Sequence, residues 1–136
     1  MFGNSRQGPR PVPPATTPSR ETILLVEDEP AVRQLFCQAL SRAGYRVHEA
    51  RNGQEALKVF DQHGESVDLL LTDMRMPFMG GGELAHQLRA KRQSLKLLCI
   101  SGYAGGSDLE FSGDFLAKPF SRDQLLAKVR EILDRQ

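Results

Sequence analysis

The sequence has no tryptophan, only two cysteines and no apolar run of membrane-spanning length. The cysteines, Cys37 and Cys99, lie in apolar segments without metal-ligand spacing, a pattern typical of buried thiols in a reducing compartment. The N-terminus also lacks the apolar core of a signal peptide. We therefore expect a soluble, cytoplasmic protein that does not insert into a membrane.

An excess of either charge is missing as well. The 136 residues include 18 basic and 17 acidic side chains, for a net charge of +1. Three of the basic residues and none of the acids lie in residues 1–20, so the remainder carries −2. No basic face with interleaved aromatic residues is present, which argues against nucleic-acid binding.

Large apolar residues are scarce in residues 1–20, which hold five of the eight prolines. Such a segment cannot bury enough apolar surface to offset the entropy lost on ordering. We expect a disordered tail or linker over residues 1–20 and one domain over residues 21–136. A chain of about 115 residues is long enough to build one hydrophobic core.

From residue 22 onward, short apolar runs alternate with amphipathic stretches. The apolar runs predict strands at 22–26, 45–49, 67–72, 95–100 and 115–117. Helical spacing and capping residues predict helices after Pro30, after Asn52, over 83–92 and after Ser121. The strands are continuously apolar, as in a parallel sheet that helices cover on both faces. The predicted fold is therefore a doubly wound α/β sandwich with five strands.

Polar residues follow four of these strands: Glu27, Asp28 and Glu29 the first, Asp73 the third, Ser101 the fourth and Lys118 the fifth. The carboxyl ends of parallel strands share one edge of the sheet, where ligands bind. Carboxylate oxygens suit Mg²⁺, and a lysine with a hydroxyl suits an anion such as a phosphoryl group. Three roles are open for a carboxylate in the position of Asp73: metal ligand, general base, or nucleophile toward phosphorus.

Four short motifs stand at these strand ends, in this order: Val26-Glu27-Asp28-Glu29, Leu71-Thr72-Asp73-Met74-Arg75-Met76-Pro77, Ile100-Ser101-Gly102-Tyr103 and Ala117-Lys118-Pro119-Phe120. Together they resemble the signatures of the response-regulator receiver domain, and the resemblance covers residues 22–135. It implies a flavodoxin-like strand order of 2-1-3-4-5. It also implies a phosphoacceptor switch of two-component signalling, with self-catalysed phosphotransfer and dephosphorylation, rather than an enzyme.

The resemblance implies a role for each acid. Asp73 accepts a phosphoryl group from the phosphohistidine of a histidine kinase or a histidine phosphotransfer protein. Glu27, Asp28 and Asp73 hold Mg²⁺, directly or through water, together with the backbone carbonyl of Arg75. The output partner is unknown, and a monomer or weak dimer is expected.

Further roles follow for the other motif residues. Ser101 bonds the phosphoryl oxygens and Lys118 pairs with them, while Gly102 leaves space above them. Phe115, three residues before Lys118, matches the aromatic residue whose inward swing reports phosphorylation. The bond before Pro119 is expected to be cis, as is typical of the family.

For five further residues, the sequence gives only weak evidence of a functional role. Tyr103 and Arg75 each lie two residues past a site residue, where family members tune the access of water to the acyl phosphate; a plain surface role fits them equally. The histidines, His48, His63 and His86, have no ligand spacing, so we interpret them as structural or solvated.

Two segments depart from the family pattern. The loop after Asp73 reads Phe78-Met79-Gly80-Gly81-Gly82 after its proline, where the family usually has Gly-x-Asp-Gly, so an acidic helix cap is missing. Phe78 and Met79 are expected to be exposed near the site, which suggests a partner surface. Only 16 residues separate Ser101 from Lys118, and several are glycine, so a short or frayed fourth helix at 107–112 is predicted.

The resemblance leaves alternatives open. The chain could be a single-domain regulator or the C-terminal receiver of a hybrid histidine kinase. It could instead be a pseudo-receiver that binds partners without phosphorylation, although the Asp73–Lys118 pair speaks against this. A phosphatase with an aspartyl-phosphate intermediate needs a second acid close after Asp73, and Arg75 occupies the obvious position.

Overall fold

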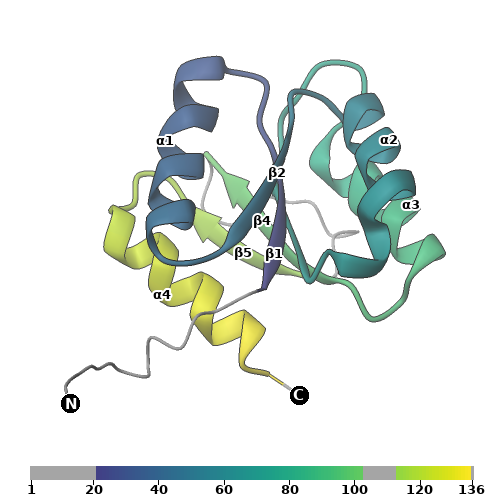
Figure 1. The fold of residues 1–136 in the computed structure, drawn as a ribbon. Helices are drawn as coiled ribbons and strands as arrows, with labels where there is room; N and C mark the ends of the chain where they lie inside the picture. Colours follow the sequence, from purple (N-terminus) through teal and green to yellow (C-terminus); the bar gives the residue numbers. More distant parts are fainter. Residues whose placement is uncertain (1–20, 103–112, 136) are drawn as a thin grey trace, which may run out of the picture.

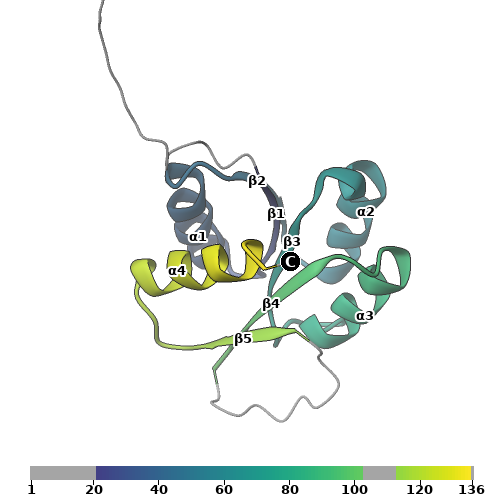
Figure 2. The same ribbon diagram turned by 90° about the horizontal axis from the view of Figure 1, so that it is seen from below.

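Five parallel strands form the central sheet of the computed structural model, which describes residues 21–102 and 113–135. The strands are β1 (Thr22–Val26), β2 (Arg46–Ala50), β3 (Leu69–Asp73), β4 (Lys96–Ser101) and β5 (Asp114–Ala117). Figure 1 shows the sheet, and β3 is labelled in Figure 2. Their order across the sheet is β2-β1-β3-β4-β5. The predicted strand number, direction and order are all confirmed.

Within residues 21–102 and 113–135, two pairs of helices cover the sheet, one pair on each face (Figures 1 and 2). One face carries α1 (Pro30–Arg42) and α4 (Arg122–Leu133), and the other carries α2 (Gly53–His63) and α3 (Gly81–Lys91). A 3-10 turn over Gly64–Ser66 follows α2. The tail at 1–20 and the short helix predicted at 107–112 lie outside the described residues. No helix among the described residues combines the length and apolarity needed to cross a membrane.

The capping residues identified in the sequence begin and end the helices as expected. Pro30 occupies the first turn of α1, and Gly44 ends that helix with a φ of 103°. The Asn52 side chain accepts a hydrogen bond from the Glu55 backbone N–H at 2.8 Å. Ser121 forms a reciprocal capping box with Gln124 at the start of α4.

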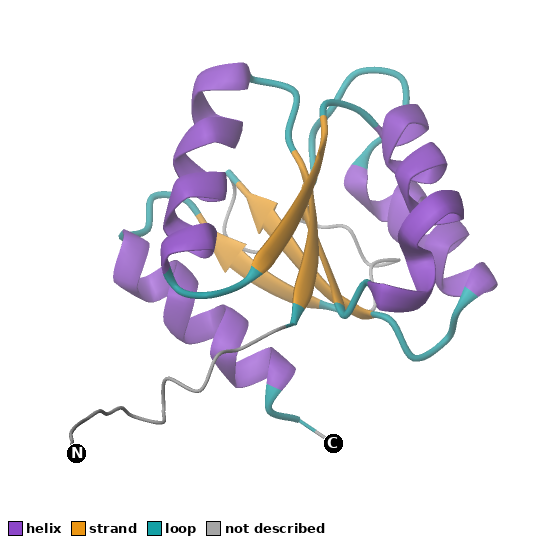
Figure 3. Cartoon of the chain, in the orientation of Figure 1, coloured by secondary structure: helices purple, strands orange, loops and turns teal. Residues whose placement is uncertain are grey.

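The apolar strands β1, β3 and β4 contribute to two hydrophobic cores, one on each side of the sheet. Figure 3 shows the helices that cover these two sides in purple. Leu24 and Leu70 pack toward α2 and α3, whereas Leu25 and Leu71 pack toward α1 and α4. Successive side chains of a strand point to opposite faces, so both must be apolar here. Burying each leucine contributes about 1.5–3 kcal/mol, and the two cores together fix the sheet that carries the site.

Two expectations from the sequence need correction. Predicted strands at 67–72 and 95–100 begin early: Asp73 and Ser101 end β3 and β4, because Asp73 pairs with Ile100 and Ser101 with Ala117. Cys99 is buried, but Cys37 is only half-buried, with its thiol 3.4 Å from Glu49 Oε2. The rings of His48 and His63 stack, with centroids 4.3 Å apart, and this contact supports their interpretation as structural residues.

Candidate functional site

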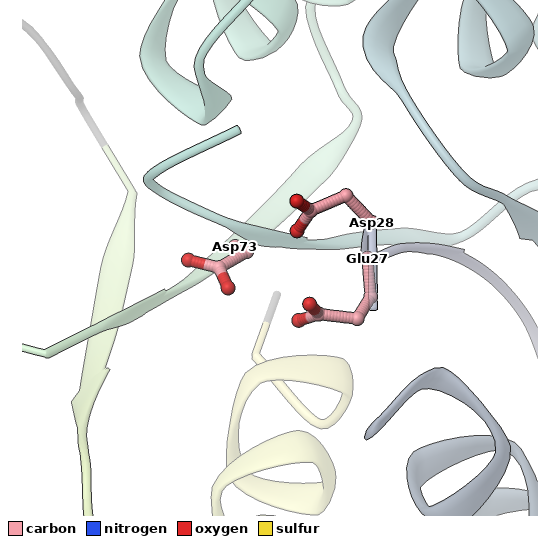
Figure 4. A group of neighbouring side chains, drawn as sticks. All are labelled: Glu27, Asp28 and Asp73. Carbon is pink, nitrogen blue, oxygen red and sulfur yellow. The ribbon is translucent and has the colours of Figure 1, made fainter. Parts of the chain in front are cut away.

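Three acids from two strands meet at the carboxyl edge of the sheet (Figure 4). Glu27 and Asp28 directly follow β1, and Asp73 ends the neighbouring strand β3. One carboxylate oxygen of each lies within 4.8 Å of the other two. Parallel pairing of β1 with β3 therefore brings together residues that are far apart in the sequence.

Glu27 is the most deeply buried of the three acids. Its side chain is 2% exposed, and its Oε2 accepts a hydrogen bond from the Glu29 backbone N–H at 3.1 Å. Its Oε1 is buried and has no hydrogen-bond partner among the described residues. Burial, followed by the charge of Asp73, raises the pKa of Glu27 from 4.5 to about 7. An orphaned carboxylate oxygen that faces two more acids is a favourable position for a cation.

Asp73 is held from two sides. It is 8% exposed, and its Oδ1 accepts a hydrogen bond from the Arg75 backbone N–H at 3.1 Å. Its Oδ2 lies 3.4 Å from Lys118 Nζ in an ion pair. The Lys118 backbone N–H donates to the Ser101 carbonyl at 2.8 Å, and the following bond to Pro119 is cis. Contacts along β4 and β5 thus place the ammonium group against the carboxylate.

The donor set fits a hard divalent cation. Mg²⁺ prefers carboxylate and carbonyl oxygens and retains several waters, and this cluster offers carboxylates with one open side at Asp28. Three carboxylates outnumber the Lys118 ammonium group that pairs with them, and a cation neutralises the excess negative charge. The structure does not test whether the Arg75 carbonyl joins them, so that ligand stays a prediction.

The remaining predicted site residues surround this cluster on β4 and β5. Ser101 is buried at the end of β4, and a Cβ placed on Gly102 would meet no heavy atom of the described residues within 4 Å. Phe115 is 37% exposed on β5, three residues before Lys118. Its role as a reporter stays a prediction, and Tyr103 lies outside the described residues.

The sequence analysis did not identify the structural role of Gly81, which is to allow close packing against the backbone of Asp73. A Cβ placed on Gly81 would lie 2.5 Å from the Asp73 carbonyl oxygen and 3.1 Å from Met74 Cα. The Gly81 backbone N–H donates to the Met74 carbonyl at 3.0 Å. Only glycine permits this approach, so the first turn of α3 lies directly against the backbone of the acid. The glycine run was the available signal, but we interpreted it only as a missing helix cap.

In the loop after Asp73, the predicted exposure is confirmed for Phe78 and is wrong for Met79. Phe78 is exposed, as expected, and has a φ of 70°. Met79 is instead packed against the core on the α2 side. A Cβ on Gly53 would lie 2.6 Å from Met79 Sδ, so the missing side chain of Gly53 provides the space for this methionine.

A family model described as the response regulator receiver domain matches residues 23–130. The sensor kinase CckA of Brucella abortus is 43% identical over 122 residues, which cover 85% of this chain and 13% of that protein. The CAI-1 autoinducer sensor kinase/phosphatase CqsS of Vibrio cholerae is 36% identical over 115 residues, covering 79% and 16%. The chain therefore spans less than a fifth of either relative.

Solved structures agree with this match. The receiver domain of a hybrid histidine kinase CckA superposes with a TM-score of 0.73 at 35% identity, covering 83% of this chain and 99% of that one. The response regulator TrrA of Thermotoga maritima, solved in complex with Mg(2+)-BeF, gives a TM-score of 0.75 at 35% identity, covering 82% and 98%.

Proposed function

The chain belongs to the response regulator receiver domain family, and from that membership we propose that Asp73 is the phosphoacceptor of a two-component phosphorelay. The donor is the phosphohistidine of a histidine kinase or a histidine phosphotransfer protein. The observation that supports this most directly is the Asp73–Lys118 ion pair beside the Glu27–Asp28–Asp73 cluster.

In the proposed transfer, an Oδ atom of Asp73 attacks phosphorus while the phosphorus–nitrogen bond to the donor histidine breaks. The electron pair of that bond returns to the imidazole, which leaves neutral because its other nitrogen keeps its proton. The Arg75 backbone N–H orients the carboxylate, and Lys118 neutralises the oxygens of the transferred group. The Ser101 hydroxyl donates to the same oxygens. Later attack by water on phosphorus releases phosphate and restores Asp73.

Glu27, Asp28, Asp73 and the Arg75 carbonyl are the residues that would hold Mg²⁺. When bound, the cation supplies positive charge against the phosphoryl oxygens. Glu27 would give up its proton to hold the cation, because its pKa of about 7 leaves it partly protonated at neutral pH. The cation would also offset the mutual repulsion of the three close carboxylates.

The likeness to CckA supports one of the two arrangements left open by the sequence. Residues 21–136 then form the receiver of a hybrid sensor kinase, with residues 1–20 as the linker that leads into it. In the other arrangement, the same domain is a single-domain regulator. In either case the domain is a switch that catalyses changes of its own phosphorylation state.

One experiment separates this function from its rivals. The protein is incubated with Mg²⁺ and acetyl phosphate, and its intact mass is measured. We expect one added phosphoryl group on the wild type, none on Asp73→Asn, and a normal addition on the control Asp61→Asn, whose acid is exposed on α2. An unmodified wild type would favour the pseudo-receiver, and rapid multiple turnover of acetyl phosphate would favour a phosphatase.

A further inference from the structure

Phe78 carries the most exposed large apolar side chain among the described residues. Its exposed fraction is 99%, compared with 65% for Leu35 and 37% for Phe115. It stands in the loop between β3 and α3, five residues after Asp73. An aromatic ring left entirely in water contributes nothing to the core and increases the tendency to aggregate.

The backbone at Phe78 is unfavourable as well. Its φ of 70° is the one positive value of a non-glycine residue among the described residues. The Met79 backbone N–H donates to the Pro77 carbonyl at 2.7 Å, which closes a three-residue γ-turn with Phe78 at its centre. This turn is rare and strained with a positive φ, and a bulky side chain makes it more so. Three glycines follow at 80–82, yet the turn itself carries phenylalanine.

The neighbours of Phe78 fix its ring on the outside of the molecule. Met76 and Met79 both pack against the core on the α2 side. Beyond them, the Gly81 backbone N–H donates to the Met74 carbonyl, which closes the loop onto the end of β3. The two methionines face inward on either side of the turn, so the ring between them has no place in the core. Strain concentrated at an exposed position of this kind is typical of functional sites.

We propose that Phe78 is an apolar anchor for the protein that donates the phosphoryl group: its ring enters an apolar pocket of the donor beside the phosphohistidine. This inference rests on the proposed function of Asp73. The donor is the partner that must cover this edge, because its phosphorus has to come within bonding distance of Asp73. An aromatic side chain has only two rotatable bonds, so it loses little conformational entropy on docking, and aromatic residues are common centres of binding energy.

The test compares two phosphodonors. Histidine kinases and histidine phosphotransfer proteins from the same genome are phosphorylated in advance, and the one that transfers fastest to the wild type serves as the protein donor. Acetyl phosphate serves as the donor without a docking surface. The variants are Phe78→Ala, Phe78→Asn and Phe78→Tyr, with Gln62→Ala at the far end of α2 as a surface control.

With the protein donor, we expect Phe78→Ala and Phe78→Asn to lower kcat/KM about 10- to 100-fold, mainly through KM, and Phe78→Tyr to stay within about threefold. With acetyl phosphate, all variants should match the wild type. Phe78→Asn should also raise Tm by about 2–6 °C, because asparagine tolerates a positive φ. A ring that served the fold would lower Tm on removal.

Other outcomes overturn the inference in distinguishable ways. Equal transfer from the protein donor to wild type and Phe78→Ala would assign the ring to an output partner or to a second copy of the chain. Equal losses with both donors would place Phe78 in the chemistry of Asp73. If no protein donor exceeds acetyl phosphate, donor docking fails while Asp73 stays an acceptor. If acetyl phosphate also leaves wild-type Asp73 unmodified, the proposed function itself fails.

Discussion

The two edges of the sheet differ in how their charges are arranged. At the amino edge, where the strands begin, acids form ion pairs with basic residues of α4 and of the segment that follows it. At the carboxyl edge, where the strands end, three acids lie close together beside the ammonium group of Lys118. Arg130 binds Glu21 at 2.8 Å, and Arg135 binds Asp114 through two contacts of 2.7 and 2.9 Å. Lys128 adds a third cation 3.6 Å from Asp114. The hydrogen bonds from Arg135 lower the pKa of Asp114, so its charge stabilises the fold.

The carboxyl edge reverses this arrangement. Glu27 and Asp28 crowd against Asp73, which pairs with Lys118, and burial raises the pKa of Glu27 to about 7. We therefore expect the charges at the amino edge to stabilise the fold, and those at the carboxyl edge to destabilise it and to serve the proposed binding of a cation and a phosphoryl group. Four changes test this difference, from the largest expected effect to the smallest.

Replacing the ammonium group of Lys118 should have the largest effect, and on function rather than on folding. We expect Lys118→Ala to slow phosphorylation of Asp73 by acetyl phosphate by about 100-fold or more, because the transferred oxygens lose their neutralising cation. Its free energy of unfolding should change by less than about 1 kcal/mol, since the pair is partly exposed.

The amino edge offers a matched control in Lys128→Ala, which also removes a lysine beside an aspartate. It should phosphorylate at the wild-type rate, as followed by intact mass over time. A slow Lys128→Ala or a fast Lys118→Ala would remove the functional distinction between the two edges.

Magnesium should stabilise the protein through the carboxyl edge alone. At a hundredfold excess over its Kd, Mg²⁺ should raise the free energy of unfolding by about 2.7 kcal/mol, measured by urea denaturation. Asp28→Asn should lose most of this gain because one of the three carboxylates is gone. Asp114→Asn should keep all of it; an equal loss in both variants would mean that the ion binds diffusely.

Removing the buried charge of Glu27 should stabilise the metal-free protein at high pH. With a folded pKa of about 7 against 4.5, the folded state retains a proton that the unfolded chain has lost. This contribution is full below pH 4.5 and disappears as pH rises through 7. The free energy of unfolding of Glu27→Gln, relative to wild type in a chelator, should therefore grow by about 2 kcal/mol between pH 5 and pH 8. A constant difference would contradict the raised pKa.

The smallest effect is expected at the amino edge. Asp114→Asn should lower the free energy of unfolding by about 1 kcal/mol at pH 7. Because the folded pKa of Asp114 is depressed, its contribution is present above the ordinary value of 3.8 and is lost as pH falls through the folded pKa. Asp123→Asn is the control, since Asp123 is exposed and makes only a long contact with Arg122. Equal effects of the two variants would show that the Arg135 contacts add nothing.

The sequence predicted the strands and the convergence of their polar ends because those features depend on local patterns and on strand direction. Apolar runs mark the strands, and parallel pairing brings Asp73 to Glu27 and Asp28. The last residue of a strand depends on its partner, however, so the predicted strands stopped one residue before Asp73 and Ser101. No local pattern specifies that pairing.

Contacts between segments that are distant in the sequence also could not be predicted from it. Met79 packs inward because Gly53, 26 positions earlier, has no side chain in its way. The exposure of Phe78 was predictable because the loop after Asp73 departs from the family's usual Gly-x-Asp-Gly. The positive φ of Phe78 was not predictable. The raised pKa of Glu27 likewise required the burial and the orphaned oxygen that only the folded structure reveals.

The contact between Gly81 and the Asp73 carbonyl has a practical use. No side chain stands between Gly81, in the first turn of α3, and the Asp73 carbonyl, so no rotamer change can absorb a shift of the Asp73 backbone. Glu83 is exposed on the same turn. A fluorophore attached at position 83 would therefore report movements at Asp73 without touching the acid cluster, which makes this turn a natural place to build an optical sensor.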